Sequence, residues 1–215
     1  MDEGAEAREI LRKGLEGLQL AAEDSQVEAL LSYLALLGRW GKVYNLTAIM
    51  ELRQAVRLHL LDSLAGSPYL PEGRILDVGT GAGLPGIPLA ILHPDRQFVL
   101  LDRTAKKIRF IRQVVMSLEL ANVEVYVGRL ESYQPDMSFD AVVTRAFANL
   151  GLFWRLASHL VSPGGRLLAW KGRLPEVELM ALAEQNVCAV AHCLRIPDMA
   201  IERHLVALSS GGLDE

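Results

Sequence analysis

The sequence has few cysteines, no long apolar run and no apolar signal segment at its start. Its two cysteines among 215 residues, Cys188 and Cys193, are five positions apart. An odd spacing places them on opposite faces of a strand, which disfavours a local disulfide or a metal pair, so we expect buried, reduced thiols. No stretch approaches the ~18 uninterrupted apolar residues of a membrane span. These absences predict a cytoplasmic protein without a membrane anchor or a bound metal.

The sequence also lacks an excess of basic residues. Its formal net charge is −4, which argues against general binding of nucleic acid. The charge is uneven, however: residues 1–95 carry 8 Lys and Arg against 13 Asp and Glu, giving −5, and residues 96–215 carry 14 against 13, giving +1. Basic residues cluster at Arg103, Lys106, Lys107, Arg109 and Arg112, and again at Arg166, Lys171 and Arg173. Each cluster predicts either a local phosphate-binding surface or a solvated helix face.

Two patterns divide the chain near residue 72. Residues 5–70 repeat apolar residues at helical spacing, with a third helix expected from Glu51 to Ser67. Beyond Arg74, strand-like runs alternate with helical stretches, which is typical of a parallel sheet covered on both faces. The expected strands are 74–78, 97–101, 123–127, 139–144, 165–170, 187–195 and 203–208, and the expected helices between them lie near 85–92, 104–119, 149–160 and 175–185. We therefore expect a helical extension (1–72) packed on an α/β core (73–215).

The last two expected strands are joined only by residues 196–202. This connection is too short for a helical crossover, so the two strands should pair antiparallel. A mostly parallel seven-stranded sheet with an antiparallel C-terminal strand is the Rossmann-like arrangement of methyltransferases rather than that of dehydrogenases.

The stretch R-I-L-D-V-G-T-G-A-G-L-P-G at 74–86 is the most informative in the chain. It predicts a strand, a tight turn and a helix N-terminus, which is the build of a nucleotide-type cofactor site. Glycine allows the backbone to approach a ligand closely. The candidate cofactor residues here are Asp77, Gly79, Gly81, Gly83 and Leu84.

The same stretch contains G-x-G-x-x-G at 81–86, the dinucleotide fingerprint, and Asp102 follows at the distance of a ribose-binding carboxylate. Asp77 argues against NAD, because a carboxylate beside the helix N-terminus repels a pyrophosphate. S-adenosylmethionine fits better, since it has no phosphate and carries a positive sulfonium and an ammonium group. The order D-x-G-x-G-x-G followed by Asp102 resembles the first two motifs of Rossmann-like methyltransferases. A dinucleotide enzyme and a glycine-rich turn without a ligand remain alternatives.

Further candidate residues lie outside the glycine stretch. Leu130 and Glu131 follow the third expected strand of the core, where backbone groups read an adenine edge or simply form a surface loop. Arg145 ends the fourth strand, next to the expected point of methyl transfer, and a structural salt bridge is its alternative role. The (N/D)-P-P-(Y/F) motif of enzymes that methylate exocyclic amines is absent. His59 and Asp62 share a helix face, as a hydrogen-bonded pair or as functional groups.

Motifs spread along the chain carry a resemblance to a known family. They are N-L-T at 45–47, R-x-H-x-L-D-S at 57–63, D-V-G-T-G-A-G-L-P-G-I-P-L-A at 77–90, L-L-D at 100–102, R-F-I-R-Q-V at 109–114, T-R-A-F-A at 144–148, W-K-G at 170–172 and E-R-H-L-V at 202–206. Together they resemble the RsmG family, formerly called glucose-inhibited division protein B. The resemblance runs from about Leu30 to Leu208.

The resemblance implies an S-adenosylmethionine-dependent enzyme that makes 7-methylguanosine in 16S ribosomal RNA, with the assembled small subunit as substrate and a monomer as the active form. Carried over by motif, the cofactor positions are Gly79, Leu84, Asp102, Leu130, Glu131 and Arg145. The chain departs from the family at 103–104, where Arg-Thr follows the ribose acid. A small-molecule methyltransferase and a binding module without turnover remain open alternatives.

The chemistry that the resemblance implies agrees with the missing motifs. The N(7) atom of guanine has an in-plane lone pair and no proton to lose, so we expect no general base and a dominant role for alignment. Arg145 is then expected to position the reactants. The residues expected to hold RNA are Lys106, Lys107, Arg109, Arg112, Lys171 and Arg173.

Overall fold

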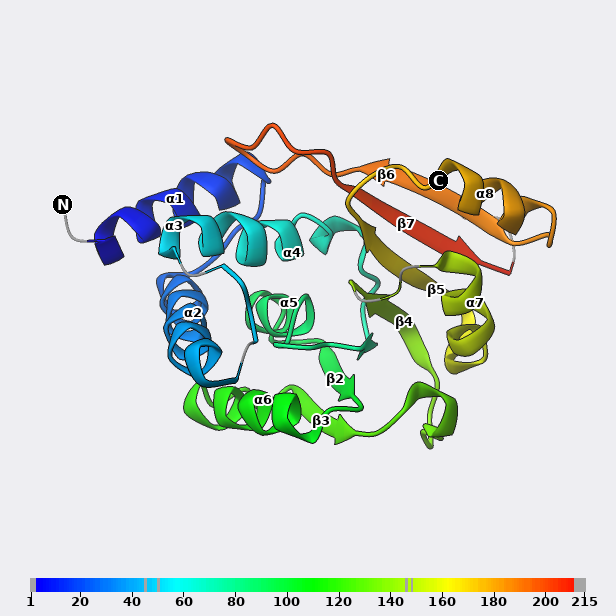
Figure 1. Cartoon of the computed structure of the whole chain (residues 1–215), viewed down its shortest axis with the longest axis horizontal. Coiled ribbons are helices and arrows are strands. Elements are labelled where there is room, and N and C mark those ends of the chain that lie inside the picture. The colour runs from blue at the N-terminus through cyan, green and yellow to red at the C-terminus, as the bar shows by residue number, and fades with distance from the viewer. Residues whose placement is uncertain (1–2, 45, 50, 146, 148, 211–215) are drawn as a thin grey trace.

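The computed structural model describes residues 3–44, 46–49, 51–145, 147 and 149–210. Its centre is a seven-stranded sheet with the strand order β3-β2-β1-β4-β5-β7-β6. The strands are β1 (Arg74–Val78), β2 (Gln97–Asp102), β3 (Val123–Val127), β4 (Phe139–Thr144), β5 (Val161–Lys171), β6 (Cys188–Cys193) and β7 (His204–Ser209). Figure 1 shows this sheet running across the molecule, with β6 and β7 at one edge.

Strand pairing follows the predicted topology. Four pairs of strands are parallel: β1 with β2, β1 with β4, β2 with β3, and β4 with β5. β7 is antiparallel to both of its neighbours, β5 and β6. The buried central strands are almost continuously apolar, as expected for strands that are covered on both faces. Because the order reverses between β1 and β4, the carboxyl ends of β1 and β2 open onto a crevice where ligands bind in such sheets.

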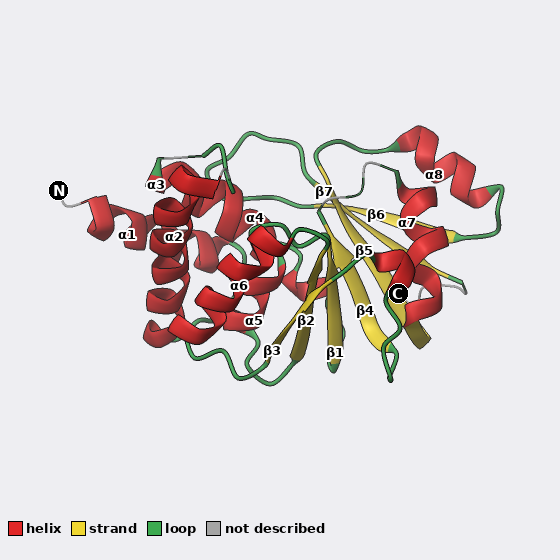
Figure 2. Cartoon of the chain, turned by 60° about the horizontal axis from the view of Figure 1, so that its bottom comes forward, coloured by secondary structure: helices red, strands yellow, loops and turns green. Residues whose placement is uncertain are grey.

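Helices cover the two faces of the sheet (Figure 2). On one face lie α5 (Gly86–Leu92) and α6 (Ala105–Ser117), together with the N-terminal helices. On the other face lie α7 (Leu150–Ala157) and α8 (Glu176–Ala183), with short 3-10 turns at Leu130–Ser132 and Ser158–Leu160. A third 3-10 turn, Ser67–Tyr69, packs on the first face. The expected helix at 149–160 is therefore two segments, α7 and the 3-10 turn that leads into β5.

The N-terminal helices share the hydrophobic core of the sheet. They are α1 (Glu3–Gly17), α2 (Asp24–Tyr44), α3 (Leu52–Ala55), a π-helical segment η1 (Val56–Leu61) and α4 (Asp62–Leu64). Leu11 and Leu30 belong to the same buried cluster as Phe110 of α6 and Leu205 of β7. Polar contacts reinforce this packing, since the Tyr33 hydroxyl donates to the carbonyl of Ala82 at 2.9 Å.

The structure corrects four sequence-based expectations about local structure. The third helix contains a π-helical turn, and no hydrogen bond between His59 and Asp62 is found among the described residues; each side chain has other partners. β5 begins at Val161 rather than near residue 165. Cys188 is half-buried and Cys193 is exposed, because both lie on the edge strand β6, so the expected burial of these thiols is wrong. Over the described ranges, no helix is long and apolar enough to cross a membrane.

Candidate active site

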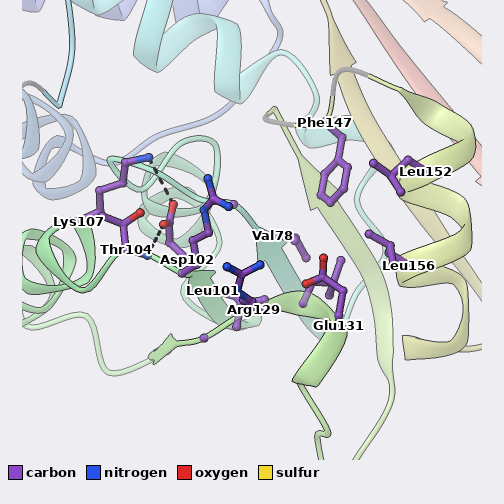
Figure 3. A pocket seen from close by; sticks show the side chains of 14 residues that line it. Val78, Leu101, Asp102, Thr104, Lys107, Arg129, Glu131, Phe147, Leu152 and Leu156 are labelled. Carbon is purple, nitrogen blue, oxygen red and sulfur yellow. Dashed lines mark hydrogen bonds and ion pairs between the residues drawn. The ribbon is translucent and has the colours of Figure 1, made fainter.

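A pocket of about 390 Å³ opens at the carboxyl ends of β1, β2 and β3. The strand ends contribute Val78, Gly79, Leu101 and Asp102, and the loop after β3 contributes residues 128–131. Charged and polar side chains from the start of α6 lie on one side, and Phe147, Leu152 and Leu156 lie on the other (Figure 3). Its size falls within the usual range for small-molecule sites, and its walls combine an apolar surface with a few polar groups.

The turn between β1 and α5 is folded back over the end of β2. The backbone N–H groups of Gly79 and Thr80 both donate to the carbonyl of Leu101, at 2.8 and 3.1 Å. Gly79, Gly81 and Gly83 have φ angles of 67°, 63° and 94°, a conformation that residues with a Cβ rarely adopt. A Cβ on Gly83 would also lie 2.5 Å from the Ile87 side chain. The backbone conformation of this turn therefore requires glycine at these three positions.

Asp102 stands where a ribose-binding carboxylate is expected, at the end of β2 and in the pocket wall. Its Oδ2 accepts from the backbone N–H of Gly81 at 3.0 Å, and its Oδ1 accepts from that of Thr104 at 2.8 Å. Lys107 Nζ lies 3.6 Å from Oδ2. Because each carboxylate oxygen has more than one lone pair, Asp102 keeps acceptor capacity for the two hydroxyls of a ribose.

Asp77 has a different environment. It is fully buried, and its Oδ2 accepts from the Thr80 hydroxyl at 2.6 Å and from the backbone N–H of Gly86 at 2.9 Å. Within the described part of the chain, Oδ1 has no hydrogen-bond partner. Burial raises the pKa of Asp77 to about 7, against the lowering effect of its two donors. Asp77 therefore fastens the glycine turn to the start of α5 and is not among the residues that line the pocket, and its contact with a cofactor stays a prediction.

The predicted cofactor residues separate into two groups. Gly79, Asp102, Leu130 and Glu131 line the pocket, so the geometry is consistent with their predicted role. Asp77, Gly81, Gly83, Leu84 and Arg145 lie outside its wall. Gly81 and Gly83 act through the shape of the turn, and Leu84 packs against the hydrophobic core.

Sequence reasoning missed the apolar wall of the pocket. Phe147, Leu152 and Leu156 come from the segment after β4, and Phe147 packs on Phe153 with ring centroids 5.1 Å apart. Phe147 lies in the T-R-A-F-A motif, just after the buried parallel strand β4. Its position at the carboxyl end of that strand could have indicated that it lines the pocket. The contribution of α7 depends on how the helix docks on the sheet, which spacing alone does not reveal.

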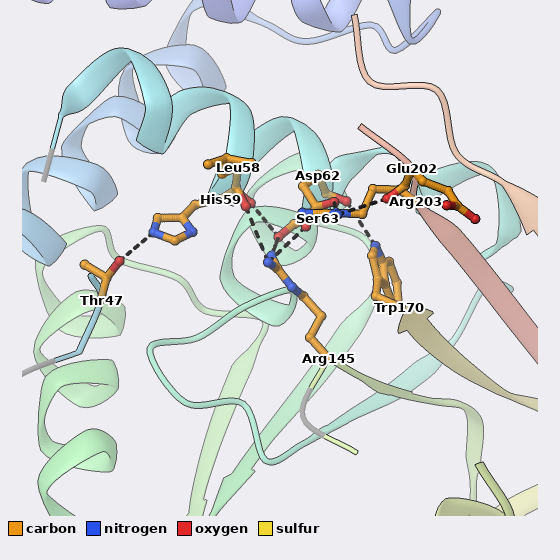
Figure 4. Close-up of polar contacts among 9 residues, drawn as sticks. All are labelled: Thr47, Leu58, His59, Asp62, Ser63, Arg145, Trp170, Glu202 and Arg203. Atoms are coloured by element: carbon orange, nitrogen blue, oxygen red, sulfur yellow. Dashed lines mark hydrogen bonds and ion pairs between the residues drawn. The ribbon is translucent and has the colours of Figure 1, made fainter. Parts of the chain in front are cut away.

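Arg145 takes part in a polar network that joins three parts of the fold (Figure 4). Its guanidinium lies 2.9 Å from Asp62 Oδ2 and donates to the Ser63 hydroxyl at 3.0 Å. Arg203, just before β7, donates to the other oxygen of Asp62 at 2.9 Å. Only 2 % of the Asp62 side chain is exposed, so this is a buried carboxylate shared by two arginines. The sequence left two roles open for Arg145, positioning the reactants or forming a structural salt bridge. The structure shows the salt bridge, and Arg145 is not among the residues that line the pocket.

Two neighbours complete this network. Trp170 Nε1 donates to the backbone carbonyl of Asp62 at 3.0 Å. His59 Nε2 lies 2.8 Å from the Thr47 hydroxyl oxygen. Burial, with a smaller contribution from the Arg145 charge, lowers the pKa of His59 to about 4, so His59 is neutral at physiological pH. Thr47 therefore contacts the R-x-H-x-L-D-S motif, and that motif in turn binds Arg145 at the start of the loop after β4.

The predicted RNA-binding residues also differ in their surroundings. Lys106, Arg109 and Arg112 of α6 are exposed, as is Arg173. Lys107 is half-exposed and lies beside Asp102 in the pocket wall. Lys171 has only 11 % of its side chain exposed and pairs with Glu178 at 3.2 Å, so its expected contact with RNA is not supported by this geometry. The described residues contain no group of three potential metal ligands.

Comparison with known proteins places the chain in a family. A family model described as rRNA small subunit methyltransferase G matches residues 26–206. The chain belongs to this family. Two relatives named ribosomal RNA small subunit methyltransferase G support the assignment. That of Methylococcus capsulatus is 50% identical over 95% of this chain and 100% of its own length, and that of Nitrosococcus oceani is 49% identical over 93% of each. The family identified from the sequence motifs is confirmed.

Solved structures of other methyltransferases share the fold of this rRNA methyltransferase family member. The glycopeptide N-methyltransferase MtfA, in complex with S-adenosyl-L-methionine, aligns with a TM-score of 0.60 at 10% identity, covering 72% of this chain and 88% of its own. A precorrin-6y C5,15-methyltransferase from Geobacter metallireducens aligns with a TM-score of 0.53 at 12% identity, covering 78% and 92%. The predicted Rossmann-like methyltransferase fold is confirmed.

The raised pKa of Asp77 predicts a specific pH dependence of stability. The folded state holds the Asp77 proton more tightly than the unfolded state, so this group's contribution to stability falls as pH rises from about 4 to about 7. Asp77→Asn keeps an acceptor oxygen without the charge. The free energy of unfolding of the wild type should fall relative to that of Asp77→Asn between pH 5 and pH 8, by at most about 1.4 kcal/mol per pH unit.

Denaturant unfolding at several pH values measures this difference. The comparison between the two proteins cancels the titration of His59 and His93, whose pKa values are both lowered to about 4, mainly by burial. A difference in unfolding free energy that stays constant from pH 5 to pH 8 would show that Asp77 is ionised in the folded protein throughout.

The Asp62 network predicts that Arg145 stabilises the fold. Arg145→Ala removes the ion pair with the buried Asp62 carboxylate and the hydrogen bonds to Ser63 and to the Leu58 carbonyl, and should lower the free energy of unfolding by about 1.5–3 kcal/mol. The same change in an Asp62→Asn background should cost clearly less, because the partner charge is already gone. Arg155→Ala, at an exposed position on α7, is the control. Equal effects of Arg145→Ala in the two backgrounds would contradict the coupling.

Proposed function

We propose that the protein transfers a methyl group from S-adenosylmethionine to the N(7) atom of a guanine in 16S ribosomal RNA of the small ribosomal subunit. Family membership supports the RNA substrate, since its relatives are named for the small-subunit rRNA. The observation that carries the cofactor assignment is the pocket itself: Asp102 at the end of β2, the glycine turn beside it and an apolar opposite wall. We also propose that the protein acts in the cytoplasm as a monomer.

The residues of the pocket fit S-adenosylmethionine. Asp102 keeps acceptor capacity for a ribose diol, and the 128–131 loop lies next to it, where an adenine would follow the ribose. Leu101 and Leu130 supply apolar surface for the base. The backbone of Gly79 lines the wall on the side of the glycine turn and leaves room for the amino acid portion.

A dinucleotide fits less well. In Rossmann dehydrogenases the pyrophosphate lies at the N-terminus of the helix that follows the glycine turn. Here the N–H of Gly86 is already bound to the Asp77 carboxyl group, and the N–H of Ile87 donates to the Gly83 carbonyl. The N–H groups that would bind a pyrophosphate are therefore occupied. The glycines of the embedded G-x-G-x-x-G allow the backbone conformation of the turn instead.

The proposed reaction needs alignment more than acid–base chemistry. When bound, S-adenosylmethionine supplies the methyl group on a positively charged sulfur. The guanine N(7) lone pair forms the new bond to carbon as the carbon–sulfur bond breaks, so the positive charge passes to the base and no proton moves. In this scheme Asp102 holds the donor, and the segment after β4 shapes the place for the base. Arg145 contributes by fixing the start of that segment to Asp62 and Ser63.

The cofactor assignment predicts the effect of Asp102→Asn. Replacing the carboxylate weakens charge-assisted hydrogen bonds worth about 1.5–3 kcal/mol each, so S-adenosylmethionine should bind at least about tenfold more weakly. The asparagine keeps an acceptor oxygen for the N–H of Gly81 or Thr104, which preserves the turn better than alanine. Calorimetric titration measures the affinity, with Asp136→Asn at an exposed site as control. Tight binding of NADH instead of S-adenosylmethionine would overturn the assignment.

Mass spectrometry of 16S rRNA from cells with and without the gene tests the function directly. We expect one 7-methylguanosine to disappear with the gene and to be restored by the purified protein acting on small subunits. Methylation of naked 16S rRNA at the same rate would exclude the assembled subunit as the preferred substrate. An unchanged nucleotide pattern would overturn the proposed function.

We further propose that exposed basic residues of α6 contact the RNA backbone. Arg109 and Arg112 lie on one face of the helix, whereas Ile108, Ile111 and Val114 are buried on the other. Because the net charge is −4, the affinity must come from such local contacts. Replacing both arginines by alanine should flatten the plot of log affinity against log salt by roughly 0.7–0.9 for each lost phosphate contact.

Small-subunit binding at several salt concentrations measures this slope. Lys13→Ala on α1 is the matched control, since Lys13 is also exposed but lies on another helix. Lys107 is unsuitable for this test, because its loss would alter the pocket around Asp102. An unchanged slope in the double variant would mean that α6 presents only a solvated face.

A further inference from the structure

Lys171 and Glu178 form an ion pair behind the apolar wall of the pocket. Lys171 is the last residue of β5, and Glu178 lies in the first turn of α8. The Lys171 Nζ lies 3.2 and 3.3 Å from the two carboxylate oxygens of Glu178. Neither residue lines the pocket. Lysine is rarely buried without a partner, and here only 11 % of its side chain is exposed.

The lengths of two neighbouring strands place Lys171 beside the segment that follows β4. β4 ends at Thr144, which pairs with Ala169, so β5 continues for two residues beyond the end of its neighbour. Lys171 therefore lies alongside the chain as it leaves the sheet. Its Nζ donates to the backbone carbonyl of Phe147 at 3.4 Å.

Glu178 holds the other end of this segment. Its Oε2 accepts from the backbone N–H of Leu150, the first residue of α7, at 2.5 Å. Asn149 caps the same helix, since its side chain accepts from the N–H of Leu152 at 2.8 Å. The first N–H groups of a helix lack partners within the helix and carry partial positive charge, so a carboxylate there is favourable. The start of α7 is thus fixed by its own cap and by a carboxylate from α8.

These contacts reach the pocket through three side chains. Phe147, whose carbonyl binds Lys171, lines the pocket and packs on Phe153 of α7. Leu152 and Leu156, which follow the N-terminus held by Glu178, line it as well. We propose that the Lys171–Glu178 pair is a positioning element that sets the apolar wall of the pocket, and with it the alignment of the guanine against the methyl donor.

The proposal rests on the proposed function and assigns neither Lys171 nor Glu178 a direct contact with the cofactor or the RNA. Lys171 and Glu178 act through Phe147 and α7, so both are positioning residues rather than catalytic residues. The pair joins the segment to the β5–α8 side of the fold, whereas Arg145 joins it to the N-terminal helices. The segment that closes the site is thereby held from two directions.

Variants of the full-length protein test the pair. Glu178→Ala and Lys171→Met remove it, whereas Lys171→Arg keeps the positive charge and its donors. Glu176→Gln is the control, since Glu176 lies on the same helix but is exposed. At saturating S-adenosylmethionine, we expect the single-turnover rate of small-subunit methylation to fall at least tenfold in Glu178→Ala and Lys171→Met. Lys171→Arg should recover most of this rate, and Glu176→Gln should retain it.

The double variant Lys171→Met/Glu178→Ala distinguishes positioning by the pair from independent effects. If the pair acts as one unit, the double variant should be no slower than the slower single variant. Multiplied rate losses would contradict the proposal, as would unchanged rates at saturating cofactor. A rate loss that follows only the fraction of unfolded protein, measured by circular dichroism at the assay temperature, would show a merely structural role.

Hydrogen exchange separates this proposal from the proposed function. In Glu178→Ala, the Leu150 amide should exchange at least tenfold faster, whereas the amides of α6 should be unchanged. This result would stand even if the wild type failed to methylate 16S rRNA, in which case the proposed function alone would fail. Unchanged exchange at Leu150 would overturn the positioning role whatever the activity.

Discussion

The structure depends most on one buried carboxylate, that of Asp62. Its two oxygens bind Arg145 and Arg203, and its backbone carbonyl accepts from Trp170, so four segments of the chain meet at one residue. A buried charge is stabilising only when it is paired and hydrogen-bonded, and both conditions are met here. The network joins the N-terminal helices to the strands that follow β4. The helical extension that precedes β1 is in this way part of the framework of the site.

Much of the fold could be predicted from the sequence, because the central strands and the glycine turn follow local rules. The strands β1, β3 and β4 have the predicted bounds, and the short connection after β6 correctly indicated antiparallel pairing. Position alone also placed Asp102 in the pocket wall, since the carboxyl ends of adjacent parallel strands meet at one edge. Burial was less predictable. Cys193 lies in an apolar stretch and is nevertheless exposed, because its strand is the edge of the sheet.

The roles of single charged residues could not be predicted, since they depend on partners distant in sequence. Asp77 and Asp102 both lie at the carboxyl end of a buried parallel strand, yet Asp77 is enclosed beneath the turn and Asp102 faces the pocket. Arg145 and Lys171 resemble candidates for substrate contact because Arg145 follows β4 and Lys171 ends β5, at the ligand-binding edge. Their actual partners, Asp62 and Glu178, lie on helices whose docking no spacing pattern specifies. The sequence thus located the site well and described its supporting contacts poorly.

The shared hydrophobic core has a consequence for the order in which the molecule is completed. Leu11 and Leu30 are buried in the same cluster as Leu194, Leu205 and Ala207, which are synthesised much later. Domains generally fold as units during synthesis, and contacts between distant segments must wait until both are present. The N-terminal helices cannot finish packing until the antiparallel strand β7 has emerged from the ribosome that makes it. In this protein, the packing of the N-terminal helices is therefore completed only after β7 has been synthesised, and the contacts that Arg203 makes with Asp62 form at the same late stage.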